Sequence, residues 1–271
     1  CRSIPAIVAA YDEPFGNASA LPTYHCQALA REHGIEVMLA GDVGDELFGG
    51  NERYRTDQIY QFYQRVPASL RRRLVEPLVF GFPISMEAVR KIQRYIRRAN
   101  TGHPDRYCEW LLLQHFDPEQ VLGPGMFSPH GDADLLAVPR ALYRAAPAHS
   151  ELNRLLFVDA QMTLGDNDLP KVVRTAEVAG VTVRFPYLDH RLAEFSGRLP
   201  VHMKVHGLEK RYLFKKATRR LLPREVLKKK KHGFGLPIGL WLRSEPKLRG
   251  MAEDILLDPR TYQRGYFQRT F

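Results

Sequence analysis

The stretch IEVMLAGDVGDELFGG, at residues 35–50, determines how we interpret the fold. Residues 35–40 form a short apolar run flanked by glycines, which is typical of a buried parallel strand. A glycine-rich turn that carries Asp42, Asp45 and Glu46 follows directly. In open α/β sheets, ligands bind at the carboxyl ends of the strands. The turn is therefore predicted to be a ligand-binding loop at a sheet edge.

The composition of this turn indicates a nucleotide as its ligand. Glycines let the backbone approach a nucleotide closely and offer N–H groups to phosphate or adenine. Carboxylates do not bind phosphate directly, so acids on the same turn are expected to hold Mg²⁺, which bridges phosphate oxygens. The simpler alternative is a tight loop in which Asp45 or Glu46 caps the following helix. We favour the nucleotide site because glycines and acids coincide at a strand end.

Toward the N-terminus, the pattern predicts further α/β structure. Residues 4–10 (IPAIVAA) are expected to form a short strand. Residues 21–33 have helical spacing, and Gly34 is placed to stop that helix. Residues 4–40 thus predict strand–helix–strand, as in a doubly wound α/β protein.

Beyond residue 50 the sequence has almost no strand signal and several helical stretches. We expect helices at residues 85–98, 151–164, 189–195 and 208–222. The first has Met86, Val89, Ile92 and Ile96 on one apolar face, and Asp189 is the expected N-cap of the third. The fold class is therefore predicted as mostly helical α/β. Residues 1–271 are read as one partial domain, with a sheet remnant and its loop at 1–50 and a helical region at 51–271.

The composition is that of a globular protein, with 44% hydrophobic and 26% charged residues among 271. Three widely spaced cysteines support no disulfide framework, so a reducing cytoplasm is expected. No apolar stretch approaches the ~20 residues that span a bilayer, and no membrane partner is expected. The net charge of +10 suits polyanions, although its spread along the chain also fits a basic solvated surface.

The loop resembles the S-G-[DE]-G-[GAS]-D-E-[LV]-F-G-G segment of class B, glutamine-hydrolysing asparagine synthetases. The resemblance implies that Ala40, Gly41 and Gly44 contact ATP. It implies that Asp42 helps to position the substrate for adenylation and that Asp45 binds Mg²⁺ and pyrophosphate. The family's usual serine is Ala40 in this chain, which preserves a backbone contact but removes a hydroxyl.

A second segment, VRFPYLDHRLAEF at residues 183–195, resembles the R-V-P-F-L-D string of the same family. Arg184 is a planar cation that suits a substrate carboxylate. The alternative is a buried structural Arg–Asp pair. Many relatives have Glu where this chain has Thr182, and Asp where it has Val173, whereas Lys171 matches. These departures leave the identity of the substrate open.

A third segment, LPREVLKKKKHGFGLPIGLWL at residues 222–242, resembles the family's K-x-G-F-x-x-P string followed by Trp. The resemblance implies that Lys231 reaches the reacting centre. A compact ammonium there neutralises charge on the adenylate phosphate and on the tetrahedral intermediate. A merely structural role of Lys231 is the alternative, and residues 228–230 are interpreted as surface charge.

Together these segments imply the C-terminal part of a synthetase domain with the fold of adenine-nucleotide alpha-hydrolases (ATP pyrophosphatases), with its S-G-G-x-D-S loop upstream of Cys1. The implied enzyme is a ligase that uses ATP and Mg²⁺ to convert aspartate to asparagine through β-aspartyl-AMP. Its ammonia would come from an N-terminal glutaminase domain outside this chain. The full-length protein, called the parent, is a candidate homodimer. The chain alone is expected to be inactive.

Two other functions remain alternatives. One is a related amidotransferase, or an enzyme like β-lactam synthetase, that acts on another carboxylate. The other is a basic helical domain that binds nucleic acid, which would need Lys and Arg interleaved with exposed aromatic side chains. We see no such interleaving in the sequence, and nucleic acid is not the expected partner.

Overall fold

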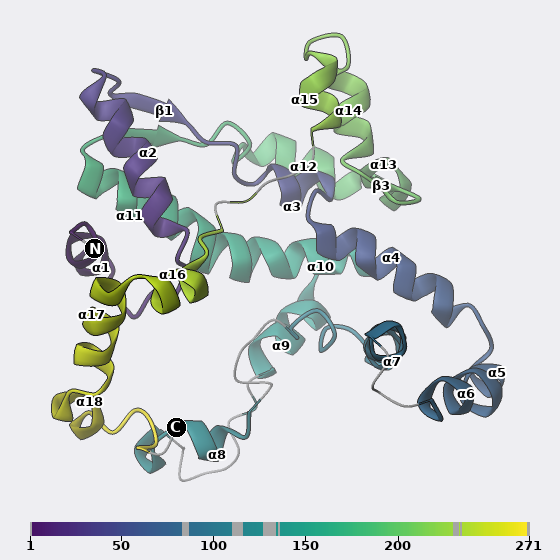
Figure 1. Ribbon diagram of the computed structural model, residues 1–271. Coiled ribbons are helices and arrows are strands. Elements are labelled where there is room, and N and C mark those ends of the chain that lie inside the picture. The colour runs from purple at the N-terminus through teal and green to yellow at the C-terminus, as the bar shows by residue number, and fades with distance from the viewer. Residues whose placement is uncertain are drawn as a thin grey trace.

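The computed structural model describes residues 2–82, 87–109, 116–126, 134, 136–229, 233 and 235–269. Within these residues the chain is an α/β protein made mostly of helices, as predicted. Figure 1 shows three regions: the pair β1–β2 with α2 and α11 at one end, a long central helix, and the helices α4 to α7 at the other end.

The strands, followed by the helices of the N-terminal half, are β1 (Val37–Leu39), β2 (Thr182–Arg184), β3 (Val205–His206), β4 (Glu209–Lys210), α1 (Ile4–Ala9), α2 (Ala20–Glu32), α3 (Gly44–Phe48), α4 (Glu52–Gln64), α5 (Ala68–Leu70), η1 (Arg71–Val75), α6 (Glu76–Phe80), α7 (Glu87–Asn100), α8 (Pro118–Val121) and η3 (Pro124–Met126). The helices of the C-terminal half are α9 (Ala137–Ala145), α10 (Glu151–Asp159), η4 (Ala160–Asp168), α11 (Leu169–Ala179), α12 (His190–Arg198), α13 (Val201–Lys204), α14 (Tyr212–Thr218), α15 (Arg224–Lys228), α16 (Ile238–Ser244), α17 (Pro246–Leu256) and α18 (Pro259–Gln263).

The strand predicted within residues 35–40 exists and is parallel to its neighbour. β1 pairs with β2, and Met38 lies opposite Val183. The predicted burial, however, is wrong, because Val37 is 54% exposed and Leu39 is 73% exposed. β1 pairs along one edge only, and no described element covers the face to which these two side chains point.

Residues 4–10 form a helix and not the predicted strand. Pro5 lies in the first turn of α1, where a missing N–H group costs nothing. Ile7 is buried, and α1 contacts both α2 and α11. Short apolar runs of this kind do not distinguish a strand from a buried helix, and here packing decides the outcome.

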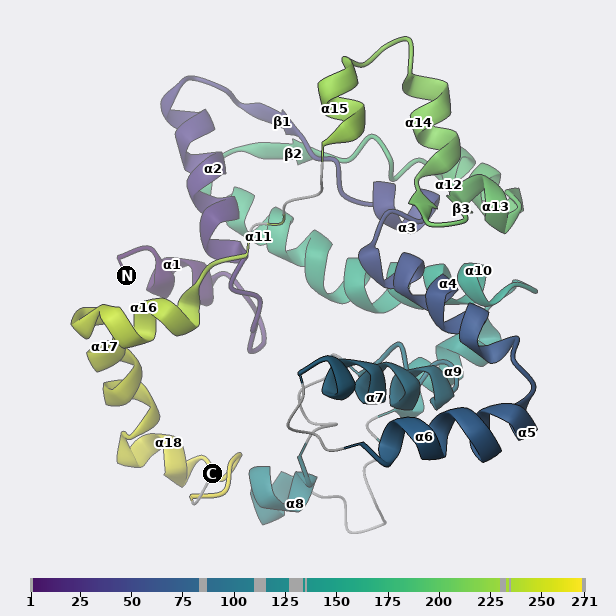
Figure 2. The same ribbon diagram turned by 45° about the vertical axis from the view of Figure 1, so that its right-hand side comes forward.

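The helix α2 confirms the prediction for residues 21–33. It packs along α11, and the two flank the β1–β2 pair (Figure 2). Gly34 has φ of +76°, as a glycine that terminates a helix commonly has.

A continuous helix formed by α10, η4 and α11 crosses the middle of the molecule (Figures 1 and 2). The side chain of Ser150 caps its start by accepting from the N–H of Asn153, and Gly180 ends it with φ of +72°. Its central segment, η4, is π-helical. Such segments are rare and occur frequently at functional sites.

At the far end of the molecule, α7 corresponds to the helix predicted at residues 85–98. Residues 83–86, which include Met86 of the predicted apolar face, lie outside the described residues. Ile96 is buried as predicted, whereas Ile92 is exposed and Gln93 takes its place on the buried face.

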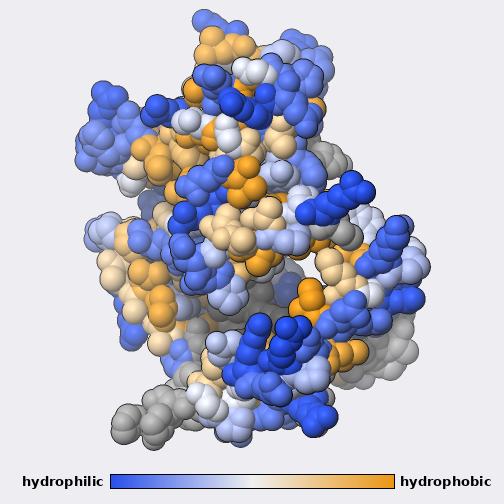
Figure 3. Space-filling view, turned by 90° about the vertical axis from the view of Figure 1, so that its left-hand side faces the viewer, coloured by the Kyte–Doolittle hydropathy of each residue, from blue (hydrophilic) through white to orange (hydrophobic). Residues whose placement is uncertain are grey.

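In the C-terminal half, the predicted N-cap is confirmed, since the Asp189 carboxylate accepts from the N–H of Arg191. The helix predicted at residues 208–222 is shorter than expected. Its first part forms the hairpin β3–β4, whose turn contains Gly207 with φ of +58°. Figure 3 views the face that carries α1, α2, α16 and α17, where apolar side chains interrupt the polar surface.

Two apolar clusters form the core. One contains Tyr54, Leu155 and Val158, and the other joins Val43, Leu47, Phe48 and Leu164. In the described part of the chain, no helix combines the length and the apolar character that crossing a bilayer requires.

Candidate functional site

The predicted loop begins where β1 and β2 end together. The N–H of Ala40 donates to the carbonyl of Arg184 at 2.9 Å, so both residues lie at the carboxyl edge of the parallel pair. Arg184 is exposed and forms no ion pair with any described residue, so the buried Arg–Asp alternative is wrong. Ala40 and Arg184, which the sequence places 144 positions apart, are neighbours in the structure.

The turn that follows has a strained backbone. Val43 has φ of +76°, which is exceptional for a β-branched residue. Its carbonyl accepts from the N–H of Leu47 at 3.0 Å, and both side chains are buried with Phe48 and Leu164. Backbone strain of this kind costs about 1–3 kcal/mol and clusters at functional sites. Packing of the loop into the core therefore holds a conformation that the backbone alone disfavours.

Asp45 lies in the first turn of α3, against the glycine pair that ends the loop. Its carboxylate lies 3.7 Å from Arg211 Nη1. A Cβ added at Gly50 would overlap both the Asp45 carboxylate and the Arg211 side chain. The backbone of Arg211 also adopts the left-handed conformation, with φ of +55°. Only a glycine at position 50 leaves room for this pair.

Acidic side chains gather around the loop and perturb one another. Burial raises the pKa of Asp42; Asp168 and Asp45 add to the rise, and Lys171 opposes it. Burial raises the pKa of Glu46 to about 7, with smaller contributions from Asp45 and other carboxylates. Lys171 pairs with Asp168 at 2.7 Å. Among the described residues, the acids around the loop (Asp42, Asp45, Glu46 and Asp168) therefore outnumber the bases beside them, Lys171 and Arg211.

A buried carboxylate from the central helix adds to this charge. Asp159 is fully buried, and its negative charge contributes to the raised pKa of Glu46. Arg53 Nη2 donates to Asp159 at 3.0 Å, Thr163 Oγ1 donates at 2.6 Å, and the hydroxyl of Tyr54 donates as well. Burial raises the pKa of Asp159, while Arg53 opposes the rise.

Two acidic residues near the loop that the sequence analysis did not identify lie on the central helix. Asp159 directly precedes the π-helical segment η4 and Asp168 is its last residue, and the sequence analysis assigns a role to neither. Lys171 carried a signal, namely its match to the family pattern. Glu46 is one of the turn acids that the sequence predicts to hold Mg²⁺ or to cap the following helix, but the sequence gives no sign of its raised pKa. The predicted catalytic Lys231 lies outside the described residues.

A groove of about 910 Å³ opens beside Arg211, between the start of α4, the β3–β4 hairpin, α14 and α15. Basic side chains dominate its polar lining: Arg55, Lys210, Arg211, Lys215, Lys228 and Lys229. The two acids in the lining are Glu52 and Glu209. The groove thus attracts anions next to the acidic loop.

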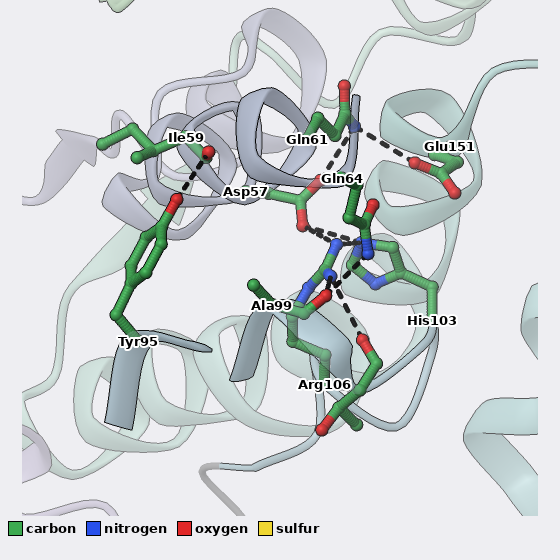
Figure 4. A network of polar contacts seen from close by, with 10 residues as sticks. Asp57, Ile59, Gln61, Gln64, Tyr95, Ala99, His103, Arg106 and Glu151 are labelled. Atoms are coloured by element: carbon green, nitrogen blue, oxygen red, sulfur yellow. Dashed lines mark hydrogen bonds and ion pairs between the residues drawn. The ribbon is translucent and has the colours of Figure 1, made fainter. Parts of the chain in front are cut away.

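A second polar cluster lies away from the loop (Figure 4). His103 Nε2 lies 2.7 Å from Asp57 Oδ1, and the Arg106 guanidinium contacts both side chains. Burial acts to raise the pKa of Asp57, but His103 and Arg106 outweigh it and hold that pKa below its usual range. Gln61 Nε2 bridges the Asp57 and Glu151 carboxylates at 3.1 Å each.

This cluster has one geometric property of a metal site. Asp57, His103 and Glu151 place ligand atoms within 4.8 Å of one another. The Arg106 guanidinium already brings positive charge to Asp57 and His103, however. We interpret the cluster as a clamp between α4, the turn at residues 103–109 and the start of α10.

Comparisons with known proteins agree with the loop chemistry. The family model "Asparagine synthase" matches residues 1–271. Asparagine synthetase [glutamine-hydrolyzing] 1 of Bacillus subtilis is 26% identical over 254 residues, which cover 90% of this chain and 37% of that protein. Asparagine synthetase [glutamine-hydrolyzing] 3 of the same organism is 33% identical over 77% of this chain and 27% of its own length.

A putative asparagine synthetase [glutamine-hydrolyzing] of Mycobacterium bovis is 26% identical over 89% of this chain and 36% of its own length. The chain thus spans about a third of the length of the curated relatives it matches. No solved structure matches it at a significant level. Because the family model covers every residue, the chain belongs to the asparagine synthase family.

Proposed function

We propose that residues 1–271 form the ATP-using part of a ligase that converts a carboxylate to an amide, with aspartate as substrate and asparagine as product. One observation carries the proposal: partly buried acids with raised pKa values lie on a strained loop at the carboxyl edge of the parallel strands. Perturbed carboxylates at such an edge are typical of a catalytic site. Family membership supports the same reaction class.

The residues take the following roles in this proposal. The backbone at Ala40, Gly41 and Gly44 binds the nucleotide, for which glycines leave the necessary space. Arg184, exposed beside Ala40, binds the substrate carboxylate. Asp42 positions the substrate for adenylation.

The reaction has two balanced steps. A side-chain carboxylate oxygen attacks the α-phosphorus of ATP, pyrophosphate leaves, and β-aspartyl-AMP forms. Ammonia then attacks the acyl carbon, AMP leaves with the electron pair of the broken C–O bond, and the nitrogen releases one proton to solvent, which gives the amide. The ammonium of Lys231 stabilises the negative charge that develops in both steps. The protein contributes mainly positioning and charge stabilisation.

The residues around Asp45 fit Mg²⁺. Their oxygen donors are those the ion prefers, and their excess negative charge favours a cation. Among the described residues, the loop acids do not converge into a ready-made metal cage. Asp45 would hold the ion together with substrate phosphates, as is usual for Mg²⁺. When bound, the ion supplies positive charge to the pyrophosphate group.

The larger context belongs to the same proposal. Residues 1–50 contribute the sheet remnant and loop of an adenine-nucleotide alpha-hydrolase-like domain, and residues 51–271 contribute its helical part. Ammonia comes from a glutaminase domain of the full-length protein. A homodimer of the full-length protein belongs to the same proposal. Another carboxylate substrate remains the alternative, since Thr182 and Val173 supply no charge where many relatives have acids.

Oxygen transfer tests this proposal. The purified full-length protein is incubated with ATP, Mg²⁺, ammonia and aspartate labelled with ¹⁸O in its side-chain carboxylate. We expect one ¹⁸O atom in the phosphate of AMP, because acyl-AMP breakdown leaves a carboxylate oxygen on phosphorus. Release of ADP, or of AMP without label, would contradict the mechanism. Glutamate, tested in parallel, checks the choice of substrate.

The variant Asp45→Asn should slow label transfer by roughly 10²-fold, as expected when a charge aimed at the transition state is lost. Asp254→Asn is the matched control, since Asp254 is an exposed aspartate on α17. It should leave the rate unchanged within about twofold.

A further inference from the structure

Two segments of the chain are strongly basic. Residues 208–229 contribute to the basic groove, and residues 65–98 contain nine Arg and Lys side chains and only two acidic ones, a net charge of +7. The second segment comprises α5, η1, α6 and α7, which lie together at one end of the molecule (Figure 2). The end is remote from the β1–β2 edge that carries the loop (Figure 1).

The helix formed by α5, η1 and α6 is continuous over residues 68–80 and is called the rod below. It presents a line of leucines to solvent. Leu70, Leu74 and Leu78 are 47%, 57% and 60% exposed, and they follow one another at intervals of four. Side chains at that interval lie one above the other on the same helix face. An apolar stripe therefore runs along the outside of the rod.

Side chains off this stripe fix the rod to the protein by polar contacts. Arg71 donates to the carbonyl of Val66 at 3.0 Å and to Asn100 at 2.9 Å. Glu76 accepts from Tyr63 at 3.1 Å and from Asn100 at 3.0 Å. Turning the leucines inward would break these contacts. Their exposure is a consequence of how the rod is anchored.

Cations flank the stripe and its neighbouring rings. Arg72 and Arg73 are exposed on the rod and form no ion pair with the described residues. Arg97 of α7 lies over the Phe80 ring at 5.5 Å. Arg65 lies over the exposed Phe62 ring at 4.8 Å. Apolar and cationic side chains thus share one surface.

We propose that the rod docks on an anionic lipid surface, with its leucines in the interface and its arginines on lipid headgroups. A helix with leucine on one face and arginine beside it is suited to the bilayer interface. Anionic headgroups attract such clusters of arginine and lysine. The expectation that no membrane partner exists rested on the lack of a spanning stretch, which an interfacial helix does not need.

The exposed leucines favour a lipid surface over nucleic acid as the partner of the rod. Phosphates would satisfy the arginines equally well, and exposed rings could stack on bases. An aliphatic stripe has no π-face for stacking and gains nothing from a polyanionic backbone. A lipid interface uses both kinds of side chain at once. This surface is independent of the proposed ligase activity.

Vesicle sedimentation tests the proposal with the purified protein. Vesicles of phosphatidylcholine with 30% phosphatidylserine are compared with vesicles of phosphatidylcholine alone. We expect at least tenfold tighter binding to the anionic vesicles and weakening at 0.5 M salt, since salt screens the arginines. Binding that does not distinguish the two compositions would overturn the proposal, and so would the lack of binding to either.

Two double variants and their controls locate the surface. Leu74→Ser with Leu78→Ser, and Arg72→Gln with Arg73→Gln, should each weaken anionic-vesicle binding at least tenfold. The controls are Leu240→Ser with Leu256→Ser, which are equally exposed leucines on α16 and α17, and Arg219→Gln with Arg220→Gln, an exposed pair after α14. Controls that weaken binding as much as the rod variants would contradict the assignment.

An RNA titration completes the test. Suppose that the protein binds RNA, that the arginine variant loses this binding and the leucine variant keeps it, and that the protein does not bind vesicles. The surface is then a nucleic-acid site and the lipid proposal is wrong.

Discussion

The loop at residues 41–50 and the rod at residues 68–80 hold their charges in different ways. In the loop, carboxylates are drawn into partly buried positions, and burial raises the pKa values of Asp42 and Glu46. In the rod, Arg72 and Arg73 project into solvent. Buried charge is costly and persists where chemistry needs it, whereas exposed charge costs little and acts on partners at long range. The contrast separates the part that reacts from the part that docks.

The largest expected effect concerns Lys231, the cation assigned to the reacting centre. Lys231→Ala should lower kcat for amide formation by roughly 10²–10³-fold, because the ammonium opposes charge that grows in the transition state. Lys228→Ala and Lys229→Ala, exposed at the end of α15, should each change kcat less than about threefold. Asparagine and pyrophosphate release measure all three. If the three variants have the same kcat, the four lysines at residues 228–231 are only a surface patch and the role assigned to Lys231 is wrong.

The sharpest test of the clamp between α4, the turn at residues 103–109 and the start of α10 is Arg106. Arg106→Leu leaves buried Asp57 without its guanidinium partner, and such a loss costs about 3 kcal/mol in the free energy of unfolding. Arg98→Leu is the control, since Arg98 forms a half-exposed pair with Glu109 at 2.6 Å. It should cost less than about 1 kcal/mol. Urea denaturation measures both. If the two variants unfold alike, the clamp does not hold this end of the molecule.

Glu46 tests whether the loop carries unrelieved charge. Its pKa rises from 4.5 to about 7 in the folded protein, so its stabilising contribution is complete below pH 4.5 and is lost as the pH rises through 7. Glu46→Gln removes the charge and should stabilise the protein by about 3 kcal/mol at pH 8, and hardly at all at pH 4.5. Thermal unfolding at the two pH values gives the difference. A gain that does not depend on pH would show that Glu46 is not buried as an acid.

The sequence predicted what adjacent residues determine. The stop of α2 at Gly34, the cap by Asp189 and the parallel strand after residue 35 all follow from local chemistry, and the structure confirms them. The mostly helical α/β class and the family resemblance are likewise confirmed. Each depended on a pattern within a few residues.

What the sequence missed depends on contacts across the chain. β2 is only three residues long, and its partner β1 precedes it by about 145 positions. The contact of Tyr54 with Asp159 joins residues 105 positions apart. Residues 4–10 form a helix because Ile7 packs on α2 and α11, which their own composition does not reveal. Burial of Leu39 failed as a prediction because burial depends on what covers a strand.

The smallest expected effect concerns the rod, and it completes the contrast with Glu46. Arg72→Gln with Arg73→Gln should leave the free energy of unfolding within about 0.5 kcal/mol, because exposed substitutions away from any contact rarely exceed that. The same variant should lose vesicle binding, as argued above. Stability and binding therefore separate in the rod, whereas in the loop one carboxylate influences both folding and the site. Thermal unfolding of the double variant, run beside Glu46→Gln at pH 8, measures the difference. A large loss of stability would show that the rod arginines hold the fold, and their exposure would then need a structural reason instead of a partner.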